Sequence, residues 1–83
     1  MEQLARTPGQ IGAALRRQRK LLKMSQDSLG KKTNLRQSTI SNLESGDAGT
    51  RLGTLLDALS ALDLELVIRT RTKGRQADIE DIF

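Results

Sequence analysis

Five polar side chains between residues 36 and 42 have the chemistry to recognise the edges of base pairs. They supply a guanidinium, two amides and two hydroxyls, on Arg36, Gln37, Ser38, Ser41 and Asn42. Such groups match the donors and acceptors in the major groove of DNA. A solvated helix face is the alternative, because Ser and Thr are common near helix starts. No acid precedes Glu44 in this stretch, however, so the pattern favours contact with DNA.

Positive charge is concentrated in the same half of the chain. Residues 1–43 carry nine Lys or Arg and two acids, whereas residues 44–83 carry five and eight, which gives net charges of +7 and −3. A concentrated positive field attracts a polyanion, although charge asymmetry alone fits a solubilising surface equally well. The only aromatic residue is Phe83, so platforms for stacking unpaired bases are missing. Double-stranded DNA is therefore the favoured target.

Composition argues against several other functions. The chain has 83 residues, enough for one small domain, and it contains neither Cys nor His. Thiolate nucleophiles, imidazole bases and the usual zinc ligands are thus unavailable, and no catalytic constellation is visible. We expect no enzyme activity, cofactor, metal or small-molecule substrate. No apolar run is long enough for a bilayer span, and the N-terminal residues lack the apolar core of a signal peptide, so we expect a cytoplasmic protein.

Hydrophobic periodicity and capping signals predict the helices that would position these side chains. We expect helices over residues 8–23, 26–33, 36 or 37–44, and 52–62. Thr7 and Ser25 are the expected N-caps of the first two, and Gln10 should reach back to complete a capping box. In the first helix an apolar stripe should leave most cations facing water, namely Arg16, Arg17, Arg19, Lys20 and Lys23.

The middle pair of helices is predicted to form a helix-turn-helix. Asn34 tolerates left-handed backbone angles and can end the helix and turn the chain. Gly30 lowers helix propensity, which close approach of the following helix would explain. The last helix should be core packing, rather than a dimer seam, through a leucine stripe made of Leu52, Leu55, Leu56, Leu59 and Leu62.

After the last predicted helix, the apolar residues recur at every second position. Apolar Leu64, Leu66 and Ile68 alternate with Glu65, Val67 and Arg69, as in a half-buried strand. A single strand leaves its backbone unpaired, and the simplest partner is the same strand of a second copy. The predicted dimer strand comprises Leu64, Leu66, Val67 and Ile68. Such a homodimer would present two recognition helices to an inverted repeat, with half-sites about 34–36 Å apart.

Residues 11–66 resemble the Xre and phage-repressor family of helix-turn-helix domains. The matching residues are Ser25, Gln26, Leu29, Ile40, Ser41, Asn42, Glu44, Gly46 and the Leu-rich segment 52–62. The resemblance implies a mainly α, four-helix, lambda-repressor-like fold, here followed by the C-terminal β-strand. It implies that Gln26 contacts the DNA backbone and orients Gln37. Base contacts would fall on the five side chains named first, and backbone contacts on Ser25, Gln26, Arg16, Arg17 and Lys20.

Within that family, four helices followed by a dimerising strand look most like the HipB-type antitoxins. The resemblance covers residues 8–70 and implies a repressor that autoregulates a toxin–antitoxin operon and binds a HipA-type kinase toxin. Residues 1–7 and 71–83 are expected to be flexible. The acidic C-terminal segment carries Ile79, Ile82 and Phe83, which could dock on the toxin. A stand-alone repressor without a toxin and a protein-interaction adaptor are the alternatives.

Overall fold

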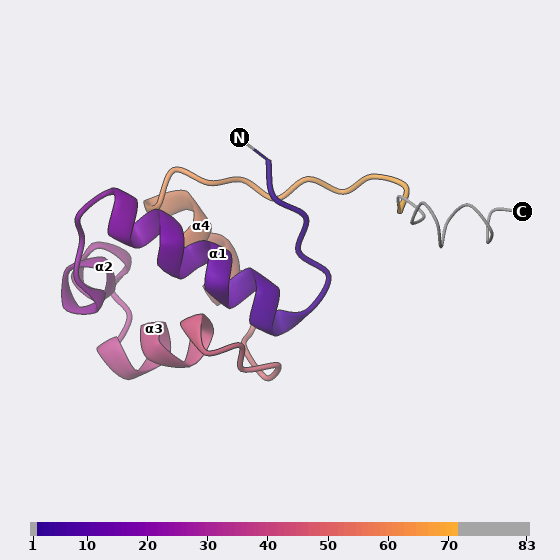
Figure 1. Ribbon diagram of the computed structural model, residues 1–83. Coiled ribbons are helices and arrows are strands. Elements are labelled where there is room, and N and C mark those ends of the chain that lie inside the picture. Colours follow the sequence, from indigo (N-terminus) through magenta and orange to yellow (C-terminus); the bar gives the residue numbers. More distant parts are fainter. Residues whose placement is uncertain (1, 72–83) are drawn as a thin grey trace, which may run out of the picture.

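A computed structural model describes residues 2–71 and shows four helices in this part of the chain. They are α1 (Pro8–Leu21), α2 (Gln26–Thr33), α3 (Gln37–Glu44) and α4 (Leu52–Ala61). Figure 1 shows α1 crossing the molecule, with α3 below it and α4 behind it. The four predicted helices are confirmed, and with them the helix-turn-helix formed by α2 and α3. Residues Ile79, Ile82 and Phe83, predicted to dock on a partner, lie outside the described residues.

The helix starts follow the predicted capping chemistry. The Thr7 hydroxyl accepts the Gln10 N–H at 3.1 Å, and the Ser25 hydroxyl accepts the Ser28 N–H at 2.9 Å. Gln10 also reaches back, and its side-chain oxygen accepts the Arg6 N–H at 2.6 Å. The two hydroxyl bonds satisfy N–H groups that the first helical turn leaves without a carbonyl partner, and the Gln10 bond ties the residue before the N-cap to the helix.

Left-handed residues end the first two helices. α1 stops at Leu21, two residues before the predicted end, because Lys23 adopts a φ of 59° and turns the chain toward α2. Asn34 has a φ of 61°, in the left-handed region that Asn is predicted to tolerate. The N–H of the following residue, Leu35, donates to the Gly30 carbonyl at 2.8 Å. A Cβ on Gly30 would lie 2.7 Å from the Leu35 carbonyl oxygen. A close approach at this glycine is therefore present, but it comes from the turn and not, as predicted, from the following helix.

One hydrophobic core joins the four helices. Its buried members are Leu15, Leu29, Ile40, Leu43, Ala58, Leu59 and Leu62. The predicted leucine stripe of α4 is only partly core, because Leu52 and Leu56 are exposed. A side-chain hydrogen bond from Gln18 to the Leu62 carbonyl, at 3.0 Å, also ties α1 to the end of α4.

The predicted strand is absent from the part of the chain that the structure describes. Residues 64–71 form no helix or strand and run out from α4 past the N-terminal residues (Figure 1). The reason is physical: a strand is defined by backbone hydrogen bonds to a neighbour, and a single copy offers this segment none. Leu64 packs against the core, but Leu66, Val67 and Ile68 are exposed. The strand is predicted to pair with a second copy, so within one copy the described residues show none, and its pairing across a dimer stays a prediction.

Candidate nucleic-acid interface

The outer face of α3 presents the five predicted base-contacting side chains to solvent. Arg36 is the N-cap of the helix and Gln37 its first residue. Both are exposed, as are Ser38, Ser41 and Asn42, while Ile40 and Leu43 on the opposite face are buried in the core. The packing of those two apolar residues thus sets the rotation of α3. An arrangement of amides, hydroxyls and a guanidinium on one exposed helix face can hydrogen-bond base edges.

The one acid of α3 is withdrawn from this face by a buried ion pair. Arg19 Nε lies 2.6 Å from Glu44 Oε2, and Arg19 Nη2 lies 3.0 Å from Oε1, a bidentate arrangement. The two side chains are only 9% and 3% exposed. Arg19 was expected to face water, and that expectation is wrong. Its charge is taken up by Glu44, so it is not available to phosphate.

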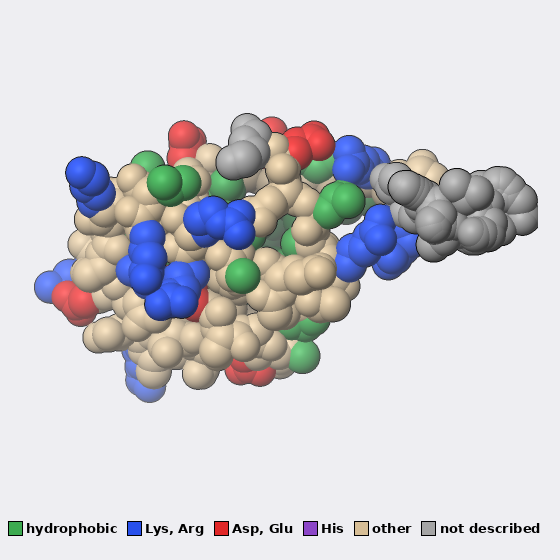
Figure 2. All heavy atoms as spheres, in the orientation of Figure 1, with side chains coloured by type: hydrophobic (Ala, Val, Ile, Leu, Met, Phe, Trp, Pro, Cys, Tyr) green, Lys and Arg blue, Asp and Glu red, His purple; other side chains and the backbone are tan. Residues whose placement is uncertain are grey.

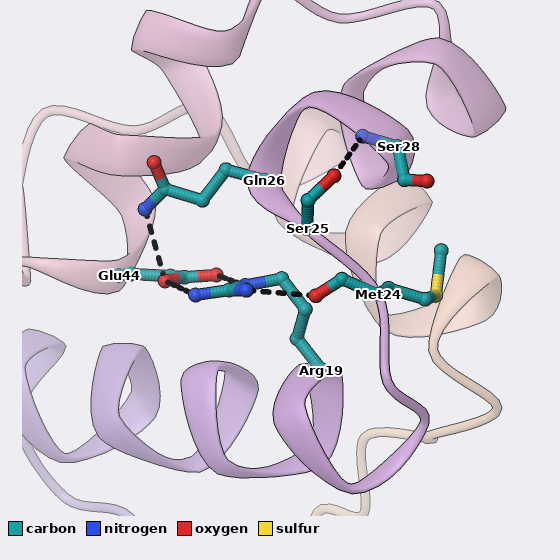
Figure 3. Close-up of polar contacts among 6 residues, drawn as sticks. All are labelled: Arg19, Met24, Ser25, Gln26, Ser28 and Glu44. Carbon is teal, nitrogen blue, oxygen red and sulfur yellow. Dashed lines mark hydrogen bonds and ion pairs between the residues drawn. The ribbon is translucent and has the colours of Figure 1, made fainter.

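Glu44 connects α1, α3 and the start of α2. Figure 3 shows its carboxylate between the Arg19 guanidinium and the Gln26 amide, with Nε2 of Gln26 at 3.1 Å from Oε1. Arg19 Nη1 also donates to the Met24 carbonyl at 2.8 Å, which holds the loop that leads into α2. The network therefore sets where Gln26 sits at the first turn of α2. The family resemblance implies that Gln26 orients Gln37. This pairing stays a prediction, because in the structure the amide nitrogen of Gln26 donates to Glu44.

The same network sets the ionisation of its members. Burial alone would raise the pKa of the Glu44 carboxyl, but hydrogen bonds from Arg19 and Gln26, and the nearby charges of Arg19 and Arg16, outweigh it and lower the pKa below its ordinary value. The hydrogen bond to Glu44 raises the pKa of Arg19, against the effect of burial. Both groups are thus charged at neutral pH, and their opposite charges largely cancel.

Sequence reasoning missed this pair, although a signal was present. Arg19 lies four residues after Leu15, which places both on the same face of α1. A cation on the buried face of a helix needs a buried anion, and Glu44 is the only acid of α3. The two residues are 25 positions apart, so the pairing itself becomes visible only in the folded chain.

The predicted backbone-contacting cations lie on the exposed side of α1. Arg16, Arg17 and Lys20 line a shallow hollow of about 270 Å³ together with Ala13 and Glu44. Since Glu44 belongs to α3, these cations lie beside the C-terminal end of that helix. Figure 2 shows Lys and Arg side chains gathered over α1 on the viewed face. The structure therefore places positive charge beside the C-terminal end of α3. Ser25 and Gln26 lie at the start of α2.

Other kinds of site are not found among residues 2–71. No group of three or more His, Cys, Asp or Glu side chains in this part of the chain could hold a metal ion. None of the described helices combines the length and the apolar character that crossing a bilayer requires.

Comparison with known proteins places this geometry in a family. Residues 15–68 match the family model described as "Helix-turn-helix". An uncharacterized HTH-type transcriptional regulator, y4dL, from Sinorhizobium fredii (strain NBRC 101917 / NGR234) is 46% identical over 58 residues, or 70% of this chain. The match spans only 30% of that relative's length.

Solved structures with a similar fold come from complexes named for HipB. A chain from the HipA–HipB–O2–O3 complex is 30% identical, with a TM-score of 0.79 over 86% of this chain and 100% of that one. A chain of a HipB–O4 20mer complex is 30% identical, with a TM-score of 0.80 over the same shares of the two chains. The chain belongs to the Xre-type helix-turn-helix family of DNA-binding transcriptional regulators, and its fold resembles that of HipB.

Proposed function

We propose that this protein is a sequence-specific repressor that binds an inverted-repeat operator as a homodimer and acts as the antitoxin of a toxin–antitoxin operon. The observation that supports sequence-specific DNA recognition is the exposed face of α3, whose only acid is buried and neutralised by Arg19. Phosphate oxygens can approach such a face without repulsion from a carboxylate. Specific duplex binding in the cytoplasm is the function that this surface fits.

Base reading and phosphate binding are assigned to different residues. We assign base contacts to Arg36, Gln37, Ser38, Ser41 and Asn42, all exposed on α3 or at its N-cap. Contacts to the DNA backbone are assigned to Ser25, Gln26, Arg16, Arg17 and Lys20. Phosphate contacts set the position and the salt dependence of binding, whereas base contacts set the preference for one sequence.

Substitution of Gln37 tests the proposal most directly. Gln37→Ala should weaken binding to the operator by about 1–3 kcal/mol and leave binding to a scrambled duplex nearly unchanged. The matched control is Arg16→Ala, which should weaken binding to both duplexes alike and reduce the salt dependence. Fluorescence anisotropy with labelled DNA from upstream of the gene measures both effects at two salt concentrations. Equal losses on the two duplexes for Gln37→Ala would refute its role in base recognition.

The antitoxin part of the proposal rests on similarity to the chain from the HipA–HipB–O2–O3 complex. A HipA-type kinase toxin would be the partner, with Ile79, Ile82 and Phe83 as docking residues. The test is co-purification with the product of a neighbouring kinase-like reading frame, using the full chain and a truncation after Thr72. Retained affinity in the truncated chain would remove the docking role of these residues. If the neighbouring gene encodes no kinase-like protein, the stand-alone repressor becomes the better proposal.

A further inference from the structure

Gln26 lies between the buried ion pair and the surface of the domain. Its Nε2 donates to Glu44 Oε1 at 3.1 Å, and Arg19 holds the same carboxylate through two hydrogen bonds of 2.6 and 3.0 Å. The Glu44 side chain is only 3% exposed, whereas Gln26 is half-buried. Gln26 therefore hydrogen-bonds a buried charge and reaches the surface at the same time.

The direction of the hydrogen bond between Gln26 and Glu44 is fixed by the chemistry of the acceptor. An ionised carboxylate can only accept, so the Gln26 amide must turn its nitrogen toward Glu44 and its oxygen away. Figure 3 shows this arrangement, with the Gln26 oxygen on the far side of the amide from the carboxylate. The lowered pKa of Glu44 keeps the carboxylate ionised at neutral pH, so the orientation holds there.

The outward oxygen of Gln26 is an acceptor that lacks a donor within the described chain. Among residues 2–71, no backbone or side-chain group donates a hydrogen bond to it. A phosphate oxygen cannot satisfy it, because both atoms are acceptors. The backbone contact assigned to Gln26 above can instead use the second N–H of the amide, which Glu44 leaves unoccupied. The oxygen itself requires a donor.

The side chain of Gln37 carries a donor of the required kind. Gln37 precedes Glu44 by seven residues, about two helical turns, so both lie on one face of α3. Helical side chains lean toward the N-terminus, which brings the Glu44 carboxylate, and the amide bound to it, toward Gln37. The Gln37 side chain is exposed and makes no hydrogen bond among the described residues. Its nitrogen is thus available to the Gln26 oxygen.

We infer that Glu44 is a positioning residue for base recognition, which sets the preferred base without touching DNA. It holds the Gln26 nitrogen, Gln26 presents its oxygen to the Gln37 nitrogen, and the Gln37 oxygen is thereby turned toward the bases. An outward amide oxygen accepts from the amino group of adenine or cytosine, and it disfavours the acceptors of guanine and thymine in the major groove. The inference rests on the assignment of base reading to Gln37 and names the source of its preference.

An uncharged isostere at position 44 would remove this order. A glutamine there offers both an oxygen and a nitrogen, so Gln26 can bind it in either orientation, and Gln37 would follow. The preference for one base should then be lost although the shape of the site is kept. A purely structural role of the ion pair predicts no such loss in molecules that remain folded.

Binding to duplexes that differ at single base pairs tests the inference. Gln37→Ala first identifies the base pair that Gln37 reads, because replacement of that pair no longer changes its affinity. Glu44→Gln should reduce the preference for that pair about tenfold or more and leave affinity for a scrambled duplex within about twofold. Leu59→Ala destabilises the domain through a core cavity and is the control, with an unchanged preference. Unchanged preference in folded Glu44→Gln would overturn the inference.

A second variant covers the case in which Glu44→Gln does not fold. Gln26→Ala leaves the ion pair of Arg19 and Glu44 in place but removes the oxygen that orders Gln37. It should reduce the preference for the same base pair by a similar factor, whatever it does to overall affinity. If Gln26→Ala weakens binding to all duplexes alike, Gln26 contacts only phosphate and the inference fails.

Exchange of the two groups separates hydrogen-bond direction from packing. In the double variant Gln26→Glu with Glu44→Gln, the carboxylate at position 26 can only accept, so the amide at position 44 must donate to it. The outward atom at position 26 is again an oxygen. The double variant should therefore recover the wild-type preference, although an acid nearer the surface lowers its affinity for every duplex. Failure to recover the preference in the folded double variant would count against the inference.

Base analogues test the predicted acceptor directly. The amino group of the base pair read by Gln37 is removed by purine in place of adenine, or by 2-pyrimidinone in place of cytosine. This change should cost wild type about as much affinity as Gln37→Ala does and should cost Gln37→Ala little. If wild type binds the analogue duplex as tightly as the natural one, the Gln37 oxygen does not face an amino group and the inference is wrong.

The outcomes separate this inference from the proposal beneath it. Equal losses on operator and scrambled duplex for Gln37→Ala would overturn base reading by Gln37 and the inference with it. If Gln37→Ala relaxes the preference but neither Glu44→Gln nor Gln26→Ala does, base reading stands and only the positioning role of Glu44 is wrong.

Discussion

A single buried carboxylate links the stability of this domain to its DNA-facing surface. Glu44 is paired with Arg19, accepts from Gln26 and ends the helix that carries the base-contacting side chains. A charge removed from water in this way is tolerated only while its partner is present. Within the folded chain Glu44 is therefore a scaffold residue.

The pH dependence of stability should reveal this carboxylate. Because the folded pKa of Glu44 lies below the ordinary value of 4.5, its contribution is present above that value and is lost as pH falls through the folded pKa. Glu44→Gln should lower the free energy of unfolding by about 3 kcal/mol at pH 7 and flatten its fall below about pH 4.5. Urea unfolding followed by circular dichroism measures both. Asp57→Asn, at an exposed position on α4, should change neither appreciably, and an equal loss in both variants would contradict the assignment.

At the scale of elements, glycine lets α1 approach the end of α3. A Cβ on Gly12 would lie 2.5 Å from the carbonyl oxygens of both Leu43 and Glu44. Those atoms are backbone, so the added carbon cannot be accommodated by a side-chain rotation. The distance between α1 and α3, and with it the geometry of the Arg19 and Glu44 pair, depends on this residue having no side chain.

Two glycine substitutions that add the same atom should therefore act in opposite directions. Gly12→Ala should destabilise the domain by about 1–3 kcal/mol or more, because α1 and α3 must move apart. Gly53→Ala, within α4 where the added Cβ would meet nothing within 4 Å, should stabilise it by about 0.4–1 kcal/mol. Thermal unfolding of the two variants beside wild type measures the difference. Similar effects from both substitutions would show that the close contact between α1 and α3 does not control stability.

At the scale of the whole molecule, the proposed dimer makes the spacing of the operator a geometric requirement. The surface of residues 64–70 and the α3 face lie on opposite sides of α1 (Figure 1), so one can join two copies while the other meets DNA. Two recognition helices related by a two-fold axis read half-sites about one helical turn apart. Binding should then depend on the helical phase of the two half-sites as well as on their sequences.

Changing the spacing between half-sites tests this arrangement. Insertion of about 5 base pairs, half a helical turn, places the second half-site on the opposite side of the duplex and should reduce affinity to that of a single half-site. Insertion of about 10 base pairs returns the second half-site to the original side of the duplex but increases the distance between the half-sites. Any recovery of affinity then measures how far the dimer can stretch. Anisotropy titrations of the three duplexes give the comparison. Unchanged affinity after the shorter insertion would mean that each copy binds DNA independently.

The sequence by itself determined the four helices, their caps, the left-handed turn at Asn34 and the polar face of α3. Membership in a family of transcriptional regulators agrees with the expectation that this domain has no enzyme activity. These features depend on residues a few positions apart, whose local hydrogen bonds and periodicity can be recognised along the chain. Tertiary structure alone decided the burial of Arg19 against Glu44 and the exposure of Leu52 and Leu56, and it left residues 64–71 without a strand. Burial and ion pairing depend on which distant segments meet, and a strand depends on a neighbour that one copy of this chain does not supply.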